Sequence, residues 1–175
     1  MTDADLAADL AKAAGRILLE VRDSGLLDGA ALGKTGDLTA NQFLVRALRH
    51  HRPEDGLLSE ESRDTEERLH KSRVWIIDPV DGTREYGEER SDWAVHVALA
   101  VDGVAALGAV ALPGLGGGLV LRSDKIGEIP HHDGPPRLVI SRTRPAAEAL
   151  SVAERLGGAL LPMGSAGAKA MAVVR

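Results

Sequence analysis

The segment 78–83 reads Asp-Pro-Val-Asp-Gly-Thr and carries the residue types most able to do chemistry in this chain. Proline fixes one backbone angle and removes a donor, so the chain must turn between Asp78 and Asp81. Two carboxylates on a fixed turn, with the Val80 carbonyl between them, suit a hard cation such as Mg²⁺, which takes oxygen ligands and keeps positions for water and phosphate. Gly82 lets the backbone approach a ligand, and it precedes a possible helix start where phosphate oxygens bind well.

The pair Glu60-Glu61 offers two more carboxylates and also follows a short apolar segment. It could converge with Asp78 and Asp81 on the same metal ions, because four carboxylates crowded at two strand ends are costly without cations. A plain acidic loop is the alternative, since Asp, Pro and Gly are ordinary turn formers and adjacent glutamates are commonly exposed.

Hydrophobic periodicity predicts the elements that must position these groups. The run 74–77 is rich in Val and Ile and predicts a buried strand that delivers Asp78 and stops at the proline that follows. Apolar residues at helical spacing predict an amphipathic helix over 3–23 and a second helix over 38–51, with a loop containing 33–36 between them. Further apolar or strand segments are predicted over 57–58, 93–100, 104–112 and 118–122, with a hairpin turn at 101–103.

A new unit is predicted after Gly134-Pro135-Pro136, which is the best linker in the chain. It contains a strand over 137–141, a helix over 145–156, a strand over 159–162, and a helix that begins near 164–167 and still runs at Arg175. The element order indicates a mixed α/β or α+β protein. We expect an N-terminal α+β metal-binding domain over 1–134 and the start of a C-terminal α/β domain over 135–175.

Composition narrows the function classes. The chain has 175 residues, 44% hydrophobic residues and no cysteine, which excludes general disorder, disulfides and a cysteine nucleophile, and fits a cytoplasmic location. The net charge is −5, and thirteen of the 26 acidic residues lie within 54–92, which argues against binding a nucleic acid polymer. No secretion signal is evident, and the uncharged stretch 104–121 is broken by 113–118, so no membrane segment is expected.

The chain resembles the inositol monophosphatase superfamily of Mg²⁺-dependent, lithium-sensitive phosphatases in the segments 58–62 and 75–83. Further segments resemble its CysQ branch, above all the actinobacterial members: Arg84-Glu85-Tyr86, Trp93-Ala94-Val95-His96, Val139-Ile140-Ser141-Arg142 and Gly164-Ser165-Ala166-Gly167-Ala168-Lys169-Ala170. That branch consists of 3′(2′),5′-bisphosphate nucleotidases, which act on adenosine 3′,5′-bisphosphate in sulfur assimilation. The resemblance covers essentially the whole chain and implies the layered αβαβα sugar-phosphatase fold with an incomplete second domain.

The resemblance also implies a role for each motif residue. Glu60 would bind metal and help position the attacking water, and Asp78 would bridge two Mg²⁺ ions. The Val80 carbonyl and Asp81 would complete the metal ligands, for two or three Mg²⁺ ions with Mn²⁺ as a substitute. Thr83 would orient the water.

The substrate contacts that the resemblance implies are less specific. Gly82 and Thr83 would hold phosphate oxygens, and Glu61 would support the metal ligands from behind. The distal phosphate or ribose would be contacted by Ser141, Arg142 and Lys169, each of which could equally be a surface residue. His96 is expected to be a packed or hydrogen-bonded histidine and not a base.

The implied reaction is metal-dependent hydrolysis of the 3′-phosphate of adenosine 3′,5′-bisphosphate, a small phosphate ester. Inositol 1-phosphate and fructose 1,6-bisphosphate are alternative substrates, an inactive truncated remnant is an alternative state, and a homodimer is a possible assembly.

Two departures from the family pattern bear on these expectations. Members carry a third metal-binding aspartate in a Trp-Asp-x-Ala-Ala motif, and this sequence reaches Arg175 without it. Many relatives also place an aspartate near Asn41, which lies here in the segment Leu38-Thr39-Ala40-Asn41. We therefore expect the second metal to lack one carboxylate, and the hydrogen bond that usually supports the active-site threonine is in doubt.

Overall fold

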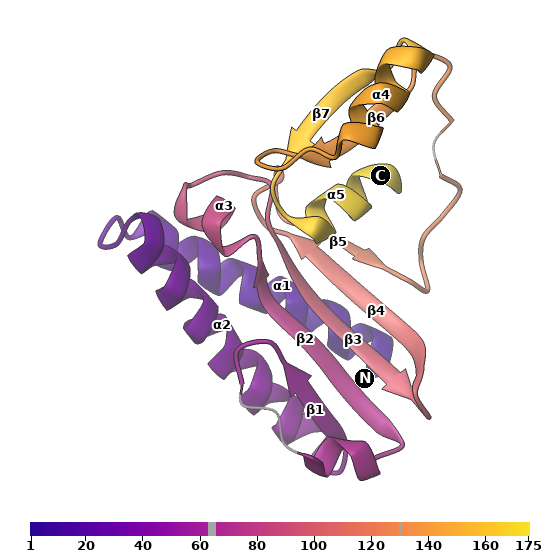
Figure 1. The fold of residues 1–175 in the computed structure, drawn as a ribbon. Coiled ribbons are helices and arrows are strands. Elements are labelled where there is room, and N and C mark those ends of the chain that lie inside the picture. Colours follow the sequence, from indigo (N-terminus) through magenta and orange to yellow (C-terminus); the bar gives the residue numbers. More distant parts are fainter. Residues whose placement is uncertain (63–65, 130) are drawn as a thin grey trace.

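The computed structural model describes residues 1–62, 66–129 and 131–175. It contains a five-stranded sheet in the order β1-β2-β3-β4-β5 and a two-stranded sheet, β6-β7 (Figure 1). The elements follow one another as α1 (Asp3–Asp23), α2 (Gly29–His51), β1 (Gly56–Ser59), the 3₁₀ helix η1 (Glu66–His70), β2 (Arg73–Asp81), α3 (Thr83–Gly87), β3 (Ala94–Val101), β4 (Val104–Leu112), β5 (Leu119–Arg122), β6 (Arg137–Ser141), α4 (Ala147–Leu156), β7 (Ala159–Met163) and α5 (Ala166–Val173).

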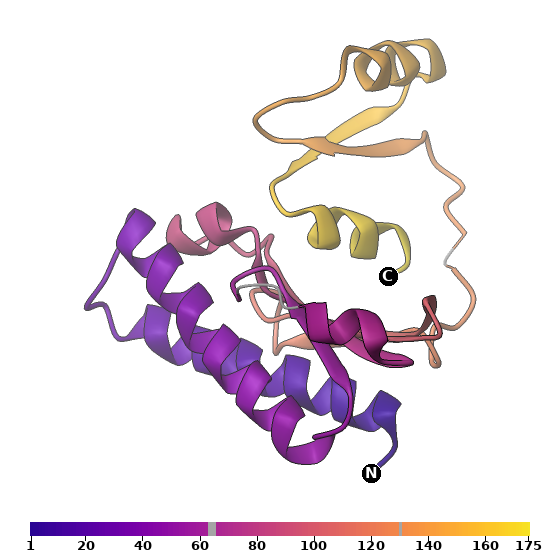
Figure 2. The same ribbon diagram turned by 60° about the horizontal axis from the view of Figure 1, so that its bottom comes forward.

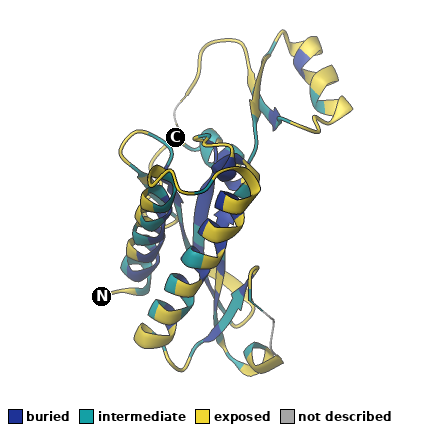
Figure 3. Ribbon diagram, turned by 90° about the vertical axis from the view of Figure 1, so that its left-hand side faces the viewer, coloured by how far each residue is buried: buried dark blue, intermediate teal, exposed yellow. Residues whose placement is uncertain are grey.

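Strand alternation separates two faces of the large sheet. On β3, Val95, Val97 and Leu99 point into the core formed with α1 and α2, whereas Ala94 belongs to a second cluster that includes Ala168 of α5. Figure 2 shows the two long helices and α5 on different sides of these strands. Buried residues gather between the long helices and the sheet, and the unit around α4 is mostly exposed (Figure 3).

The helix predicted over 3–23 is confirmed as α1. Thr2 caps its start, because the Thr2 hydroxyl accepts a hydrogen bond from the Asp5 N–H at 3.1 Å. Leu6, Leu10 and Leu18 then recur on the buried face.

The second helix begins nine residues earlier than predicted, at Gly29, so the loop expected around 33–36 is wrong. Glycine is a poor helix former, and this is why the sequence indicated a loop. Both glycines are needed for close packing: a Cβ at Gly33 would lie 2.9 Å from the Thr83 carbonyl oxygen, and one at Gly36 would collide with the Tyr86 ring. Packing against α3 therefore outweighs the local preference.

Strand β2 also continues past the predicted stop at Pro79 and ends at Asp81. Its antiparallel pairing with β3 joins Asp78 to His96 and Asp81 to Ala94, so the register shifts between the two aspartates. Pro79 lies in this irregularity, where it removes no ladder hydrogen bond. The chain therefore does not turn between the two aspartates as predicted: it stays in the strand through the bulge, and the turn follows at Gly82.

Strands β1 and β2 are parallel, and their register pairs Ser59 with Ile77. The residues that follow, Glu60 just after β1 and Asp78 within β2, therefore lie next to each other at the end of this pairing. The Glu60 N–H donates to the Ile77 carbonyl at 3.4 Å, which carries the pairing one step beyond β1.

The remaining predicted elements are confirmed with small shifts. The β3–β4 hairpin turns at Asp102 and Gly103, both with positive φ. Strand β6 has its predicted bounds, α4 begins at Ala147, and the last helix ends at Val173 instead of running to the last residue. Among the helices of the described ranges, none is long and apolar enough to cross a membrane.

Candidate active site

Asp78 carries a buried carboxylate oxygen that the protein does not satisfy. Its Oδ1 atom has no hydrogen-bond partner among the described residues. Burial, followed by repulsion from Asp81 and Glu60, raises the pKa of Asp78 to about 6. A buried carboxylate oxygen without a donor is unfavourable, and a cation beside it would remove that cost.

Asp81, at the other end of the bulge, is surrounded by donors. Its Oδ2 lies 3.1 Å from His96 Nε2 and also accepts from the Gly167 N–H, and its Oδ1 accepts from the Ala166 N–H at 3.2 Å. Burial acts to raise the pKa of Asp81, but the hydrogen bonds with His96 and Gly167 lower it to about 2. Asp81 is therefore ionised and faces the start of α5, and His96 is a hydrogen-bonded histidine as predicted.

Thr83 begins α3 and faces a carboxylate that sequence reasoning missed. Its hydroxyl lies 3.3 Å from Asp37 Oδ2 and 3.1 Å from the Val80 carbonyl. Asp37 is 8% exposed, and its Oδ1 is a second buried oxygen without a hydrogen-bond partner in the described part of the chain. Burial, followed by repulsion from Glu61, raises the pKa of Asp37 to about 7.

The hydrogen bond that supports Thr83, which the sequence around Asn41 put in doubt, is present in the structure and is made by Asp37. Asn41 lies one turn further along α2 and bonds elsewhere: its Oδ1 accepts from the Ser59 hydroxyl at 2.7 Å, and its Nδ2 donates to Ser62 at 3.1 Å. Asp37 and Asn41 are four positions apart and so lie on the same face of α2, which could have pointed to Asp37 from the sequence. That inference requires a helix that includes Asp37, and the predicted helix began at 38.

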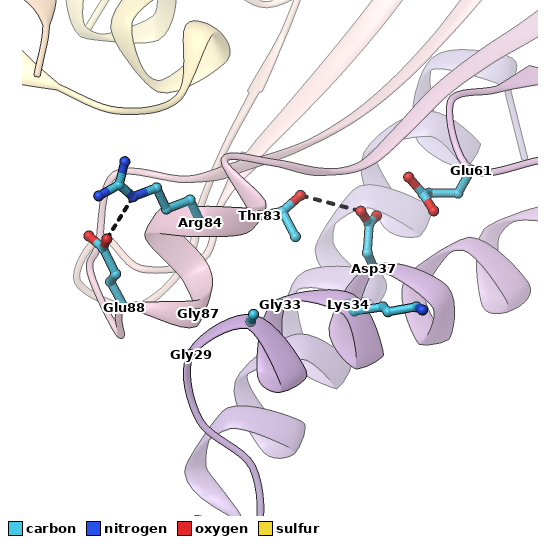
Figure 4. Close-up of a pocket in the computed structure, with 10 residues that line it drawn as sticks. Gly29, Gly33, Lys34, Asp37, Glu61, Thr83, Arg84, Gly87 and Glu88 are labelled. Carbon is cyan, nitrogen blue, oxygen red and sulfur yellow. Dashed lines mark hydrogen bonds and ion pairs between the residues drawn. The ribbon is translucent and has the colours of Figure 1, made fainter. Parts of the chain in front are cut away.

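A cavity of about 540 Å³ opens between the first turns of α2 and α3 (Figure 4). The Thr83 and Asp37 side chains point toward each other in its wall, and Lys34 lies one turn before Asp37. Arg84 pairs with Glu88 at 2.7 Å on its rim. The lining consists of Gly29, Ala30, Gly33, Lys34, Asp37, Glu61, Thr83, Arg84, Gly87 and Glu88.

The other predicted residues fall into two groups. Gly82 has φ 94°, a left-handed conformation that favours glycine. Glu60 and Glu61 are exposed, and in addition to burial both raise the pKa of Asp37. The three residues predicted to contact the distal phosphate or ribose instead make hydrogen bonds to other groups of the protein in this structure. Lys169 Nζ donates to the carbonyls of Gly164 and Ser165 at 2.6 and 2.8 Å, the Ser141 hydroxyl accepts from the Arg144 N–H at 3.1 Å, and Arg142 donates to Glu85 and Glu88.

A family model described as "Inositol monophosphatase family" matches residues 3–158, which is most of the chain. The chain belongs to this family. The resemblance seen in the sequence is thereby confirmed, and enzymes of the family are generally metal-dependent.

Curated relatives of the family place the chain near one branch. It is 47% identical over 188 residues to the 3′-phosphoadenosine 5′-phosphate phosphatase of Mycobacterium leprae, covering 99% of this chain and 69% of the relative. The protein of the same name in Mycobacterium tuberculosis is 46% identical over 92% of this chain and 64% of its own length. The 3′(2′),5′-bisphosphate nucleotidase CysQ of Escherichia coli K12 is 30% identical over 87% of this chain and 69% of its own. The chain thus spans about two thirds of the length of these relatives.

Solved structures of the family share the fold. CysQ from Bacteroides thetaiotaomicron matches with a TM-score of 0.76 at 20% identity, over 98% of this chain and 76% of that one. The Thermotoga maritima IMPase matches with a TM-score of 0.73 at 21% identity, over 99% and 72%. The predicted mixed α/β class and inositol monophosphatase-like fold are confirmed.

The family's need for a metal can be tested against the residues present. Within residues 1–62, 66–129 and 131–175, no group of three or more His, Asp and Glu side chains forms a ready metal cage. The two unpartnered oxygens on Asp78 and Asp37 are nevertheless what a divalent cation, or water bound to one, would satisfy. The donor set is all oxygen, so it fits a hard metal ion.

Proposed function

We propose that this chain carries the catalytic site of a metal-dependent 3′(2′),5′-bisphosphate nucleotidase that removes the 3′-phosphate of adenosine 3′,5′-bisphosphate. The observation that carries the proposal is the buried Asp78 oxygen that has no hydrogen-bond partner among the described residues. It lies in β2, five residues before Thr83, whose hydroxyl faces Asp37 in the wall of the cavity. The 47% identity to a mycobacterial protein named for this substrate supports the choice of ester.

The metal ligands that we propose are Glu60, Asp78, the Val80 carbonyl and Asp81, with Mg²⁺ as the ion and Mn²⁺ as a substitute. When bound, the metal would supply charge stabilisation at phosphorus and a water of lowered pKa. Glu60 and Asp78 lie next to each other at the end of the β1–β2 pairing, so both can face the same ion. For Asp81 to bind metal, its carboxylate must exchange part of its hydrogen bonding with His96 and α5 for the ion.

The residues of the chain itself orient the reaction. When the Thr83 hydroxyl donates its proton to Asp37, its lone pairs are left free to accept a hydrogen bond from the attacking water. The amides of Gly82 and Thr83 begin α3, and helix N–H groups in a first turn have no intrahelical partner, so they can hold phosphate oxygens. Lys34 in the cavity wall supplies a cation for a second phosphate.

The test is phosphate release from adenosine 3′,5′-bisphosphate by this chain with Mg²⁺ and with EDTA. Inositol 1-phosphate and fructose 1,6-bisphosphate serve as competing substrates. We expect Mg²⁺-dependent release with the nucleotide preferred, and loss of at least about 100-fold in kcat for Asp78→Asn. Asp102→Asn on the exposed hairpin turn is the matched control, since it makes the same chemical change far from the site.

Two outcomes would contradict the proposal. Preference for inositol 1-phosphate would place the chain in another branch of the family. A folded protein that releases no phosphate from any of the three esters would show that this chain is not a complete catalyst.

A further inference from the structure

Arg142 joins the second sheet to the helix that carries Thr83. It follows β6, and its Nη2 atom donates to Glu85 Oε1 at 2.7 Å and to Glu88 Oε2 at 2.8 Å. Glu85 lies on α3, and Glu88, three positions later, is the residue that caps its C-terminal end. One guanidinium therefore holds both carboxylates.

The Glu85 carboxylate is enclosed where it meets Arg142. Glu85 is 7% exposed, and a Cβ added at Gly164 would collide with its carboxylate, so the loop before α5 packs directly on it. Within the described residues, no side chain other than Arg142 donates a hydrogen bond to Glu85. A buried carboxylate that loses its cation is strongly unfavourable, so this contact has a defined partner and geometry.

Helix α3 depends on such contacts because it has only five residues. A helix of one turn gains little from its own hydrogen bonds and is stabilised by what it packs against. Its first residue is Thr83, whose hydroxyl must face Asp37. Any movement of α3 would therefore move the hydroxyl relative to that carboxylate.

We infer that Arg142 is a positioning residue: by holding Glu85 and Glu88 it fixes α3, and through α3 the direction of the Thr83 hydroxyl. The inference rests on the proposed function for its catalytic consequence. It assigns Arg142 a role distinct from the contact with a distal phosphate or ribose that the family resemblance implied. The Arg142 guanidinium does not line the cavity beside Thr83.

The first test measures α3 directly and needs no activity. Hydrogen exchange is followed at the amides of Tyr86 and Glu88, which bond the carbonyls of Gly82 and Arg84 at 2.9 Å each. We expect Arg142→Gln to exchange at least about tenfold faster at both amides. Arg144→Gln is the control, because Arg144 is exposed, lies in the same loop and has no ion pair among the described residues; it should stay within about twofold of the wild type.

Unchanged exchange in Arg142→Gln would overturn the inference. Arg142→Gln leaves Glu85 charged and buried, and the variant could fold poorly for that reason alone. The double variant Arg142→Gln/Glu85→Gln removes this charge, so its exchange rates can be compared with those of the wild type. The double variant should also show faster exchange than the wild type at Tyr86 and Glu88.

The second test uses the kinetics on adenosine 3′,5′-bisphosphate. We expect Arg142→Gln to lower kcat about tenfold or more with KM within about twofold, because orientation and not binding is lost. Glu85→Gln should lower kcat in the same way, and the double variant should be no worse than either single one. A raised KM with unchanged kcat would show that Arg142 binds substrate directly and would overturn the inference. If the wild type releases no phosphate, the proposed function fails, and the exchange rates alone decide whether Arg142 fixes α3.

Discussion

Asp37 should make the metal-free protein less stable as the pH rises. Its pKa is raised from an ordinary 3.8 to about 7, first by burial and then by repulsion from Glu61. A carboxyl group whose folded pKa lies above its unfolded pKa contributes its full stabilisation below the unfolded value. That contribution is lost as the pH rises through the folded value, so the loss runs from about pH 4 to just above pH 7.

The size of the loss follows from the two pKa values. With an unfolded pKa of 3.8 and a folded pKa of about 7, the linkage relation gives roughly 2–3 kcal/mol of lost unfolding free energy between pH 5 and pH 8. Asp37→Asn keeps the shape of the side chain and cannot ionise. The variant should therefore lose that much less stability than the wild type over the same interval. Asp78 titrates in both proteins and largely cancels in the comparison.

The measurement is urea unfolding at pH 5 and pH 8 in EDTA, on the wild type, Asp37→Asn and Asp102→Asn. We expect the wild type and Asp102→Asn to lose roughly 2–3 kcal/mol more than Asp37→Asn. Mg²⁺ should restore stability to the wild type mainly at pH 8, where the carboxylates are ionised. Parallel pH dependence in the wild type and Asp37→Asn would refute the reasoning, because it would mean that Asp37 titrates alike in the folded and unfolded states.

Two further substitutions test the threonine and the close helix packing. Thr83→Val removes the hydroxyl with little change in size, so kcat for phosphate release should fall about 100-fold or more. Thr83→Ser keeps a hydroxyl and should keep most of the wild-type kcat. Equal rates for the two variants would contradict the role assigned to Thr83. Gly36→Ala should lower the unfolding free energy measured in urea by about 1–3 kcal/mol, because its Cβ would meet the Tyr86 ring. A Cβ at Gly116 meets nothing, so Gly116→Ala should change the unfolding free energy little. Equal effects of the two substitutions would show that α2 and α3 are not in tight contact.

Elements with a strong local signal could be predicted from the sequence. Helix α1 has a capping threonine and a regular apolar face, and strand β6 is a short apolar run between a proline pair and a serine. The motif 78–83 likewise indicated an irregular backbone, because proline restricts the chain and glycine permits unusual angles wherever they occur. In each of these cases the deciding interactions lie within a few residues along the chain.

Features decided by distant contacts could not be predicted. The first turns of α2 contain Gly33 and Gly36, and only the positions of Thr83 and Tyr86 explain why glycine is suitable there. Asp37 was missed for the same reason, since its importance depends on where that helix begins. The contacts of Arg142 were equally hidden, because its partners lie 54 and 57 positions away.

The gathering of carboxylates at the site explains both its instability without metal and its expected function. Parallel pairing of β1 with β2 brings Glu60 next to Asp78, and the close approach of α2 to α3 brings Asp37 to Thr83. Each step adds a carboxylate to a region that already repels it, and the pKa values of Asp78 and Asp37 are raised first by burial and then by that repulsion. A core chosen for stability alone would not collect these groups. Because a divalent cation converts the same repulsion into binding energy, the instability of the metal-free protein at neutral pH and its affinity for metal should rise and fall together across variants of these carboxylates.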